Sequence, residues 1–187
     1  MTDLNPTSIS WPLVSIDFEA SGLGEGTYPI EVGLAVWHGP DTPIRTWSTL
    51  IAPTPDWVAR GVWKSEAESV HKIDRESLHY GQRPSEVIRQ LNSIIGFAGI
   101  ALCDGGKHDR YWLDRLIEAS EEPVGFALAS WYLITLGYSI EQMKRHCDFH
   151  PELEPPHRAG PDAANNMRLI AHALGYPNLP EHALDVP

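Results

Sequence analysis

Cysteine, basic residues and long apolar runs are all scarce in this sequence. Two cysteines in 187 residues are too few for the disulfide framework of a small secreted domain and make no zinc-finger spacing. Only 14 Lys and Arg stand against 25 Asp and Glu, and on bulk charge alone the formal net charge of -11 argues against a nucleic-acid partner. No apolar run approaches the roughly 18 residues of a membrane span, and the first residues lack the basic and apolar regions of a secretory signal. We therefore expect a reduced, cytoplasmic protein with no membrane contact.

The residues that are present predict one globular domain. Hydrophobic residues make up 42% and charged residues 21% of the chain, which is ordinary for a folded soluble domain and too apolar for a disordered one. A chain of this length holds one domain with one sizeable core. We expect a single domain over residues 1–187, with its core at about 13–174 and flexible ends at 1–10 and 176–187.

Hydrophobic patterns predict a mixed α/β architecture. Short runs rich in branched and aromatic residues predict three strands, and their close connections favour an antiparallel meander. These strands are expected at 12–18, 30–37 and 44–51. Apolar spacing and capping residues then predict a helix at 84–96, a strand at 100–103, a helix at 107–120, an ambiguous apolar segment at 124–136, a short helix at 139–146 and a last helix from Pro161 to Leu174. This order fits a mixed sheet with helices packed on it.

The first candidate site is the end of the first strand. Asp17 and Glu19 are two positions apart, so strand geometry points both carboxylates to the same side. A lone charge among apolar neighbours is costly, and carboxylate oxygens suit Mg²⁺ or Mn²⁺. The turn Ala20-Ser21-Gly22-Leu23 exposes backbone N–H groups that a phosphate or sugar can approach. A solvated strand end is the alternative interpretation.

Two more acidic positions follow along the chain. Asp109 lies at the start of the helix expected at 107–120, where a carboxylate is also favoured simply by the helix dipole. Asp104, in the same loop, competes with it for any metal role. In the third group, Pro161 leaves His157 outside the helix while Asp162 lies in its first turn. One residue can then hold a cation while the other moves a proton; an ordinary loop histidine and first-turn carboxylate are the alternative.

Together the three groups resemble the three exonuclease motifs of the DEDDh branch of the DEDD 3′-5′ exonucleases, which includes the proofreading subunit of bacterial replicative polymerase. The resemblance covers about residues 13–174 and implies an RNase H-like fold, with a five-stranded mixed sheet and helices on both faces. The residues that carry it are Asp17-Phe18-Glu19-Ala20-Ser21-Gly22-Leu23, Asp109 ahead of Trp112-Leu113, and His157 with Asp162. Val70-His71-Lys72-Ile73 is similar to the family's Val-His-Gly-Ile segment, and Glu31-Val32-Gly33 resembles its second strand.

The sequence departs from the family pattern at three places. In the second motif, the family's Asn-x-x-Phe-Asp is replaced by residues 104–109, and the helical register favours Asp109 over Asp104. Gly160-Pro161 replaces the more usual Leu-Asp of the third motif, which a helix start tolerates. Lys72 takes the place of a glycine.

The resemblance implies a two-metal phosphodiesterase. Two divalent cations, Mg²⁺ or Mn²⁺, would be held with Asp17 bridging both, Glu19 and Asp162 on one, and Asp109 on the other. His157 would deprotonate the attacking water, releasing nucleoside 5′-monophosphates from the 3′ end of single-stranded or short DNA or RNA. The substrate would be held by the turn Ala20, Ser21, Gly22 and Leu23, with the Leu23 side chain between the last two bases and His71 as a weaker candidate contact.

Two other functions stay open at this point. The same fold can serve as a nucleic-acid or nucleotide-binding module without catalysis. The pair Asp17 and Glu19 can also be read as the carboxylates of a glycosidase, where the His-x4-Asp pattern has no role. A homodimer or a polymerase partner is compatible with the sequence. Two divalent cations would reverse the local charge, so the acidic composition favours short or single-stranded ends and salt-sensitive binding.

Overall fold

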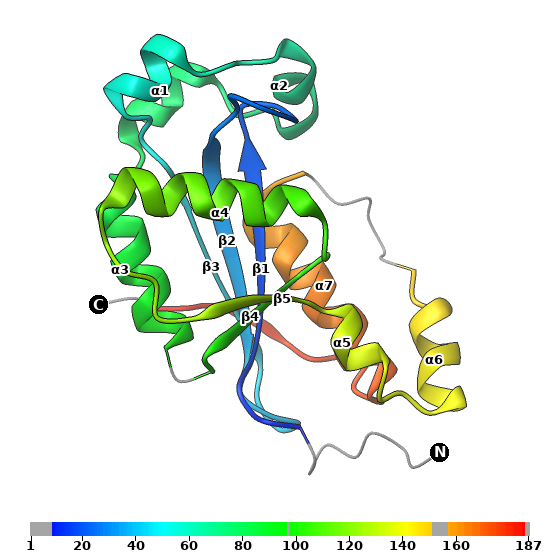
Figure 1. Cartoon of the computed structure of the whole chain (residues 1–187). Helices are drawn as coiled ribbons and strands as arrows, with labels where there is room; N and C mark the ends of the chain where they lie inside the picture. The colour runs from blue at the N-terminus through cyan, green and yellow to red at the C-terminus, as the bar shows by residue number, and fades with distance from the viewer. Residues whose placement is uncertain (1–8, 97, 151–156, 186–187) are drawn as a thin grey trace.

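A computed structural model describes residues 9–96, 98–150 and 157–185. Within these ranges six strands form one sheet in the order β5-β4-β1-β2-β3-β6 (Figure 1). The strands are β1 (Leu13–Ala20), β2 (Pro29–Trp37), β3 (Ile44–Leu50), β4 (Ile100–Cys103), β5 (Ala127–Ser130) and β6 (Glu181–Ala183). The first three form the expected antiparallel meander, whereas β4, β5 and β6 pair in parallel with β1, β4 and β3. The predicted mixed α/β sheet is confirmed.

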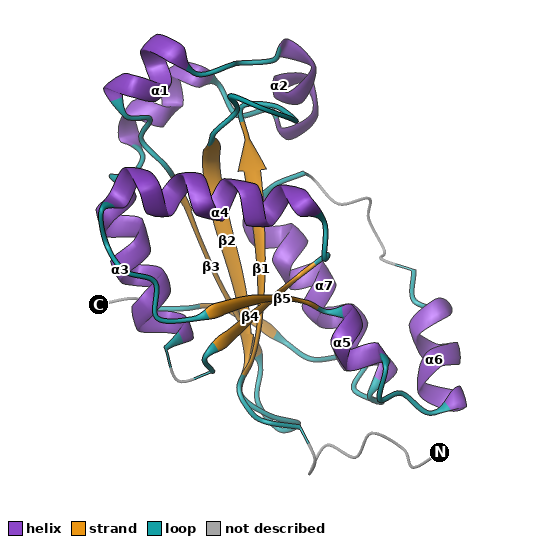
Figure 2. Cartoon of the chain, viewed as in Figure 1, coloured by secondary structure: helices purple, strands orange, loops and turns teal. Residues whose placement is uncertain are grey.

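Helices cover both faces of this sheet (Figure 2). They are α1 (Pro55–Arg60), α2 (Ser65–His71), the 3₁₀ helix η2 (Arg75–Tyr80), α3 (Pro84–Ile95), α4 (Lys107–Ser120), α5 (Tyr132–Thr135), α6 (Ile140–Cys147) and α7 (Ala159–Ala173). Helices α3 and α4 lie on one face and α7 on the other, while α1 and α2 lie beyond the ends of β1 and β2. None of the helices in the described part of the chain is long and apolar enough to cross a membrane.

The sheet separates two hydrophobic cores. On β1, Val14, Ile16 and Phe18 pack in the core under α3 and α4, whereas Leu13 belongs to the core under α7. Side chains alternate along a strand, so every second residue of β1 counted from Leu13 also faces α7. Asp17 and Glu19 are two of these positions, which places both carboxylates on the α7 side at the end of β1.

A sixth strand corrects the expected five. Residues 181–183 were assigned to a flexible end, but they pair with β3 from Ile44 to Thr46, and the Leu184 N–H donates to the Thr46 carbonyl at 2.7 Å. An ion pair between Arg168 on α7 and Glu181 holds this strand from the helix side. The flexible start expected at 1–10 falls mostly on residues 1–8, which lie outside the described residues.

The last helix also begins earlier than predicted. Arg158 is its N-cap and α7 starts at Ala159, so Pro161 lies within the first turn and not at its first position. Proline fits there because the first-turn N–H groups have no helical acceptor. The segment at 124–136, ambiguous in sequence, divides into β5 and α5.

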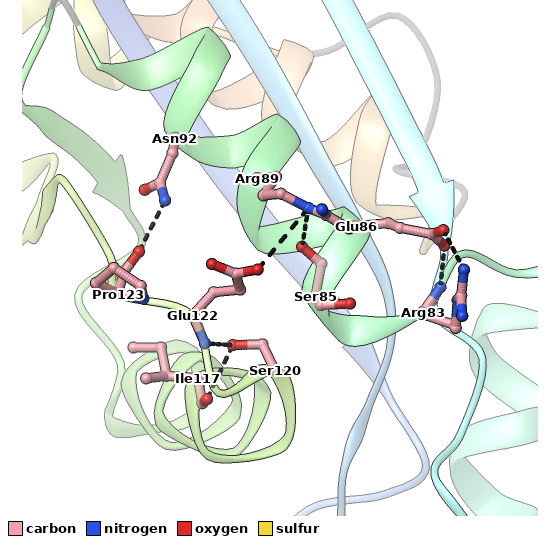
Figure 3. A network of polar contacts seen from close by, with 9 residues as sticks. All are labelled: Arg83, Ser85, Glu86, Arg89, Asn92, Ile117, Ser120, Glu122 and Pro123. Atoms are coloured by element: carbon pink, nitrogen blue, oxygen red, sulfur yellow. Dashed lines mark hydrogen bonds and ion pairs between the residues drawn. The ribbon is translucent and has the colours of Figure 1, made fainter.

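Polar contacts fasten α4 to α3 at one end (Figure 3). The Asn92 side chain on α3 donates to the Pro123 carbonyl at 2.8 Å and accepts from the Gly125 N–H at 2.8 Å. Arg89 lies 4.0 Å from Glu122, just after α4. These contacts hold the C-terminal end of α4 in place, while its N-terminal turn carries Asp109 toward the end of β1.

Candidate functional site

Carboxylates from distant parts of the chain meet at the end of β1. Asp17 and Glu19 on β1 and Asp162 in the first turn of α7 each offer an oxygen, and these oxygens lie within 4.8 Å of one another. Figure 1 shows the beginning of α7 beside β1. The structure therefore brings together the first and third groups predicted from sequence.

The fourth carboxylate comes from α4. Asp109 is 5% exposed, and its charge is the strongest of the neighbouring charges that act on Asp17. Asp104 is exposed and accepts a hydrogen bond from the Gly106 N–H at 2.7 Å. It still lies close to Asp109, since Cys103, Asp104 and Asp109 form a second group with ligand atoms within 4.8 Å. Of the two aspartates that the sequence left in competition, Asp109 is the buried one and Asp104 the exposed one.

Burial and mutual repulsion disfavour the charged forms of these carboxylates. Burial, followed by the charges of Asp109 and Glu19, raises the pKa of Asp17 to about 9. Burial, followed by the charge of Asp162, raises the pKa of Glu19 to about 8. Burial and the neighbouring Asp104 raise the pKa of Asp109 to about 7. Such a cluster ionises fully at neutral pH only when positive charge is supplied from outside it.

A hard divalent cation fits this arrangement. The Oδ1 atom of Asp162 is buried and has no hydrogen-bond partner among the described residues, although buried polar atoms are normally paired. Mg²⁺ and Mn²⁺ prefer carboxylate oxygens of this kind. A cation bound by Asp17, Glu19 and Asp162 would pair this oxygen and would offset the repulsion that contributes to the raised pKa values.

His157 lies at the edge of the cluster. It is exposed and precedes the N-cap of α7, with φ at 49°. Burial raises the pKa of Asp162, and the charge of nearby His157 opposes this shift. The imidazole is therefore close enough to act on the carboxylate cluster electrostatically while it remains open to water.

The turn after β1 is held from within the protein. The Ser21 hydroxyl donates to the Val62 carbonyl at 2.7 Å and accepts from the Tyr28 N–H at 3.0 Å. Ser21 is fully buried, so its side chain supports the turn and is not available to a ligand. Its neighbour Ala20 is also buried.

The tip of the same turn presents groups that are available. Leu23 is 58% exposed, and in the described part of the chain no hydrogen bond uses the N–H of Gly22 or Leu23. The Lys64 Nζ donates to the Leu23 carbonyl at 2.5 Å, and a Cβ atom at Gly22 would lie 2.8 Å from the Lys64 side chain. Gly22 is thus required by this close contact, and the turn offers two amides beside an apolar tip.

His71, which the sequence suggested as a weaker substrate contact, is buried. It is 2% exposed, and its Nδ1 accepts from the Ile73 N–H at 3.0 Å. Its ring packs edge-on against Trp63, with centroids 6.2 Å apart, and burial lowers its pKa. The next residue, Lys72, ends α2 in a left-handed conformation with φ at 57°, which glycine adopts without strain. His71 is therefore enclosed by protein. Its Nε2 has no hydrogen-bond partner among the described residues, and Ala20, Glu31 and Arg158 near the end of β1 also act on its pKa.

The sequence did not predict the contact between Glu31 and Arg158. Glu31 on β2 is 2% exposed, and its carboxylate accepts from Arg158 Nε at 2.9 Å and Nη2 at 2.6 Å. Glu31 also lies directly opposite Glu19 in the β1–β2 register. The available signal was a glutamate within the otherwise apolar run of β2, since a buried charge needs a partner.

Known proteins resemble this chain in structure but not in sequence. No protein-family profile matches it, and no curated protein matches it significantly. Cell-death related nuclease 4 (CRN-4) is similar with a TM-score of 0.62 and 13% identity, covering 89% of this chain and 65% of that one. A structure described as 3′-end specific recognition of histone mRNA stem-loop by 3′-exonuclease has a TM-score of 0.63 and 13% identity. The match covers 94% of this chain and 66% of that one. A full-length 3′-exonuclease has a TM-score of 0.63 and 14% identity, covering 87% and 81%.

These similarities establish the fold. The chain has the RNase H-like α/β fold that the sequence predicted, and it shares this fold with the three nucleases. It spans about two thirds of the length of the first two structures.

Proposed function

We propose that this protein is a metal-dependent 3′-5′ exonuclease. It hydrolyses phosphodiester bonds at the 3′ end of single-stranded or short DNA or RNA and releases nucleoside 5′-monophosphates. The observation that carries the proposal is the convergence of Asp17, Glu19, Asp109 and Asp162 at the end of β1. Similarity in fold to 3′-exonucleases supports it.

The carboxylates hold the cations. Asp17, Glu19 and Asp162 would bind divalent cations, and Asp109 would complete the site for a second one from the α4 side. When bound, two Mg²⁺ or Mn²⁺ ions would supply the positive charge that stabilises the attacking and leaving oxygens of a phosphodiester. The raised pKa values of Asp17 and Glu19 support this role. They result from burial and from repulsion between neighbouring carboxylates, and a bound dication would offset both effects.

His157 moves the proton. It lies outside α7 and beside Asp162, so it can accept a proton from the attacking water without binding the cation itself. Its exposed side chain allows that proton to leave to solvent. General-base assistance of this kind contributes about 10² to 10⁴-fold in rate.

The turn after β1 binds the terminal nucleotide. The N–H groups of Gly22 and Leu23 donate to the nucleotide, and the exposed Leu23 side chain inserts between the last two bases. Ser21 and Lys64 hold the turn in shape from behind. The acidic composition limits the length of strand that the surface can hold by charge, which favours short or single-stranded 3′ ends. Low cysteine content supports a reducing cytoplasmic location.

The test uses oligonucleotides labelled at either end. With Mg²⁺ or Mn²⁺, a 3′ label is expected to appear at once as mononucleotide, whereas a 5′ label marks a ladder of shortened products. Single-stranded DNA, RNA and a dinucleotide are compared, with Asp17→Ala as the control variant. Full activity of Asp17→Ala, or in excess chelator, would contradict the mechanism, and Mn²⁺ binding without turnover would indicate a binding module instead.

A further inference from the structure

An ion pair fastens the start of α7 to β2. The Glu31 carboxylate accepts from Arg158 Nε at 2.9 Å and Nη2 at 2.6 Å, and also from the Ala159 N–H at 3.0 Å. Glu31 is buried, and these hydrogen bonds raise the pKa of Arg158 further. Two parallel bonds from one guanidinium fix direction as well as distance, so the N-cap of α7 is held in one orientation.

The backbone of β2 receives the same turn of α7 directly. Gly33 lies two residues after Glu31, on the same face of the strand. A Cβ atom at Gly33 would lie 2.1 Å from the Ala159 carbonyl carbon and 2.2 Å from the Gly160 nitrogen. Glu31 therefore binds the start of α7, and Gly33 leaves the space into which it fits.

This contact adjoins both β1 carboxylates. In the antiparallel register Glu19 lies opposite Glu31, and Asp17 lies opposite Gly33. Arg158 directly follows His157 in sequence, and its carbonyl accepts from the Asp162 N–H at 3.0 Å. A shift of Arg158 would therefore move His157 and Asp162 together, relative to carboxylates that stay on the sheet.

Charge also favours the pair. Glu31 acts on Glu19 as a like charge, whereas Arg158 acts in the opposite direction. Without the guanidinium, a buried Glu31 carboxylate would add repulsion beside the cluster, and an unpaired buried charge is strongly unfavourable. Arg158 thus offsets a charge that the cluster could not otherwise accommodate.

We propose that Glu31 and Arg158 are positioning residues that set His157 and Asp162 against Asp17 and Glu19. The inference rests on the proposed function and deepens it. Neither residue binds substrate or cation in this role. The pair instead determines whether the carboxylate on α7 and the histidine before it occupy the places that cation binding and proton transfer require.

The experiment compares Arg158→Lys with Arg168→Lys. Lys keeps the charge but cannot form the two parallel hydrogen bonds, and Arg168 pairs with Glu181 far along the same helix. Calorimetric titration with Mn²⁺ is expected to show about 10 to 100-fold weaker binding for Arg158→Lys, the range typical of residues that orient a metal ligand. In oligonucleotide assays kcat is expected to fall by a similar factor with KM little changed. Arg168→Lys should match the wild type in both measurements.

A second variant separates positioning from folding. Glu31→Gln keeps an oxygen for the Ala159 N–H, so it is expected to fall between the wild type and Glu31→Ala in Mn²⁺ affinity, with all three folded at the assay temperature by circular dichroism. Adding Arg158→Lys to Glu31→Gln should produce less than the sum of the two effects, since both act on one contact.

Mn²⁺ affinity and kcat unchanged in Arg158→Lys would overturn the positioning role, even where wild-type activity upholds the proposed function. A wild-type protein that binds Mn²⁺ without turnover would refute the function alone, and one that does neither would overturn both.

Discussion

Gly33 on β2 and Ala159 at the start of α7 approach so closely that a side chain at position 33 would overlap the helix backbone at 2.1 Å. The contact lies between backbones, so no side chain can turn aside to relieve it. It joins the sheet that carries Asp17 and Glu19 to the helix that carries Asp162. The separation of the site's two halves is thus set where α7 meets the sheet.

Gly33→Ala should displace α7 and weaken the fold. We expect a loss of about 3 kcal/mol in the free energy of unfolding, at the upper end of the usual range for overpacking, measured by chemical denaturation. Gly125→Ala is the control, because a Cβ atom at position 125 would lie 3.5 Å from its nearest neighbour, Asn92 Oδ1, which is an ordinary van der Waals distance, so little change in the free energy of unfolding is expected. Equal losses in the two variants would contradict the close contact.

Asp17→Asn should separate stability from activity. Burial and repulsion from Asp109 and Glu19 keep this carboxyl mostly protonated at pH 8 in the folded, metal-free protein, so it must take up a proton on folding. A neutral amide avoids this cost, and without metal the variant should be more stable at pH 8 by about 1 kcal/mol. Mg²⁺ should no longer raise its melting temperature, and nuclease activity should be lost. Differential scanning calorimetry with and without Mg²⁺ measures the stability and the Mg²⁺ effect, and the oligonucleotide assay measures the activity. A variant less stable than the wild type without metal would contradict the repulsion.

The metal-free protein should lose stability as pH rises. The folded pKa values of Asp17, Glu19 and Asp109 are about 9, 8 and 7, against ordinary values of 3.8, 4.5 and 3.8. Between about pH 4 and 9 the folded protein therefore binds more protons than the unfolded chain, and the free energy of unfolding must decrease with rising pH. The contribution is fully present below the unfolded values and is lost as pH passes through the folded ones.

Melting temperatures in chelator at pH 5 to 9 test this slope. Mg²⁺ should raise the melting temperature more at pH 8 than at pH 5, because protons compete with the cation at the lower pH. Asp17→Asn should show a shallower slope. A melting temperature in chelator that rises from pH 5 to pH 8 would show that other groups dominate.

The two histidines of the family-like motifs should behave in opposite ways. His157→Asn is expected to lower kcat by about 10² to 10⁴-fold and leave the melting temperature nearly unchanged, because the side chain is exposed. His71→Ala is expected to lower the melting temperature, because the ring is buried against Trp63 and bonded to the Ile73 N–H, while the folded fraction keeps its turnover. Unchanged turnover in His157→Asn would remove the general base from the mechanism.

Local patterns in the sequence predicted part of the arrangement around Asp17, for physical reasons, whereas only the family resemblance linked Asp109 and Asp162 to it. Strand alternation alone places Asp17 and Glu19 on one side, and the proline near the start of α7 leaves His157 outside the helix. The direction in which His71 points was beyond such reasoning, because α2 and its left-handed end at Lys72 decide it. The Glu31–Arg158 contact joins residues 127 positions apart, and β6 exists only because β3 offers it an edge. Both depend on tertiary packing that no local pattern contains.

Leu23 provides a test of substrate contact that is separate from metal chemistry. Its side chain is 58% exposed at the tip of the turn, so Leu23→Ala should change the free energy of unfolding by less than about 0.5 kcal/mol. If the side chain inserts between the terminal bases, truncation removes about 1 kcal/mol of apolar contact, which corresponds to about a 5-fold loss in kcat/KM on an oligonucleotide.

Val58→Ala is the control, since Val58 on α1 is 53% exposed and has no place in the proposed site. Hydrolysis of a non-nucleotide phosphodiester, which has no bases to separate, should be equal in both variants and the wild type. Equal kcat/KM values for the two variants on the oligonucleotide would show that Leu23 makes no contact with the substrate.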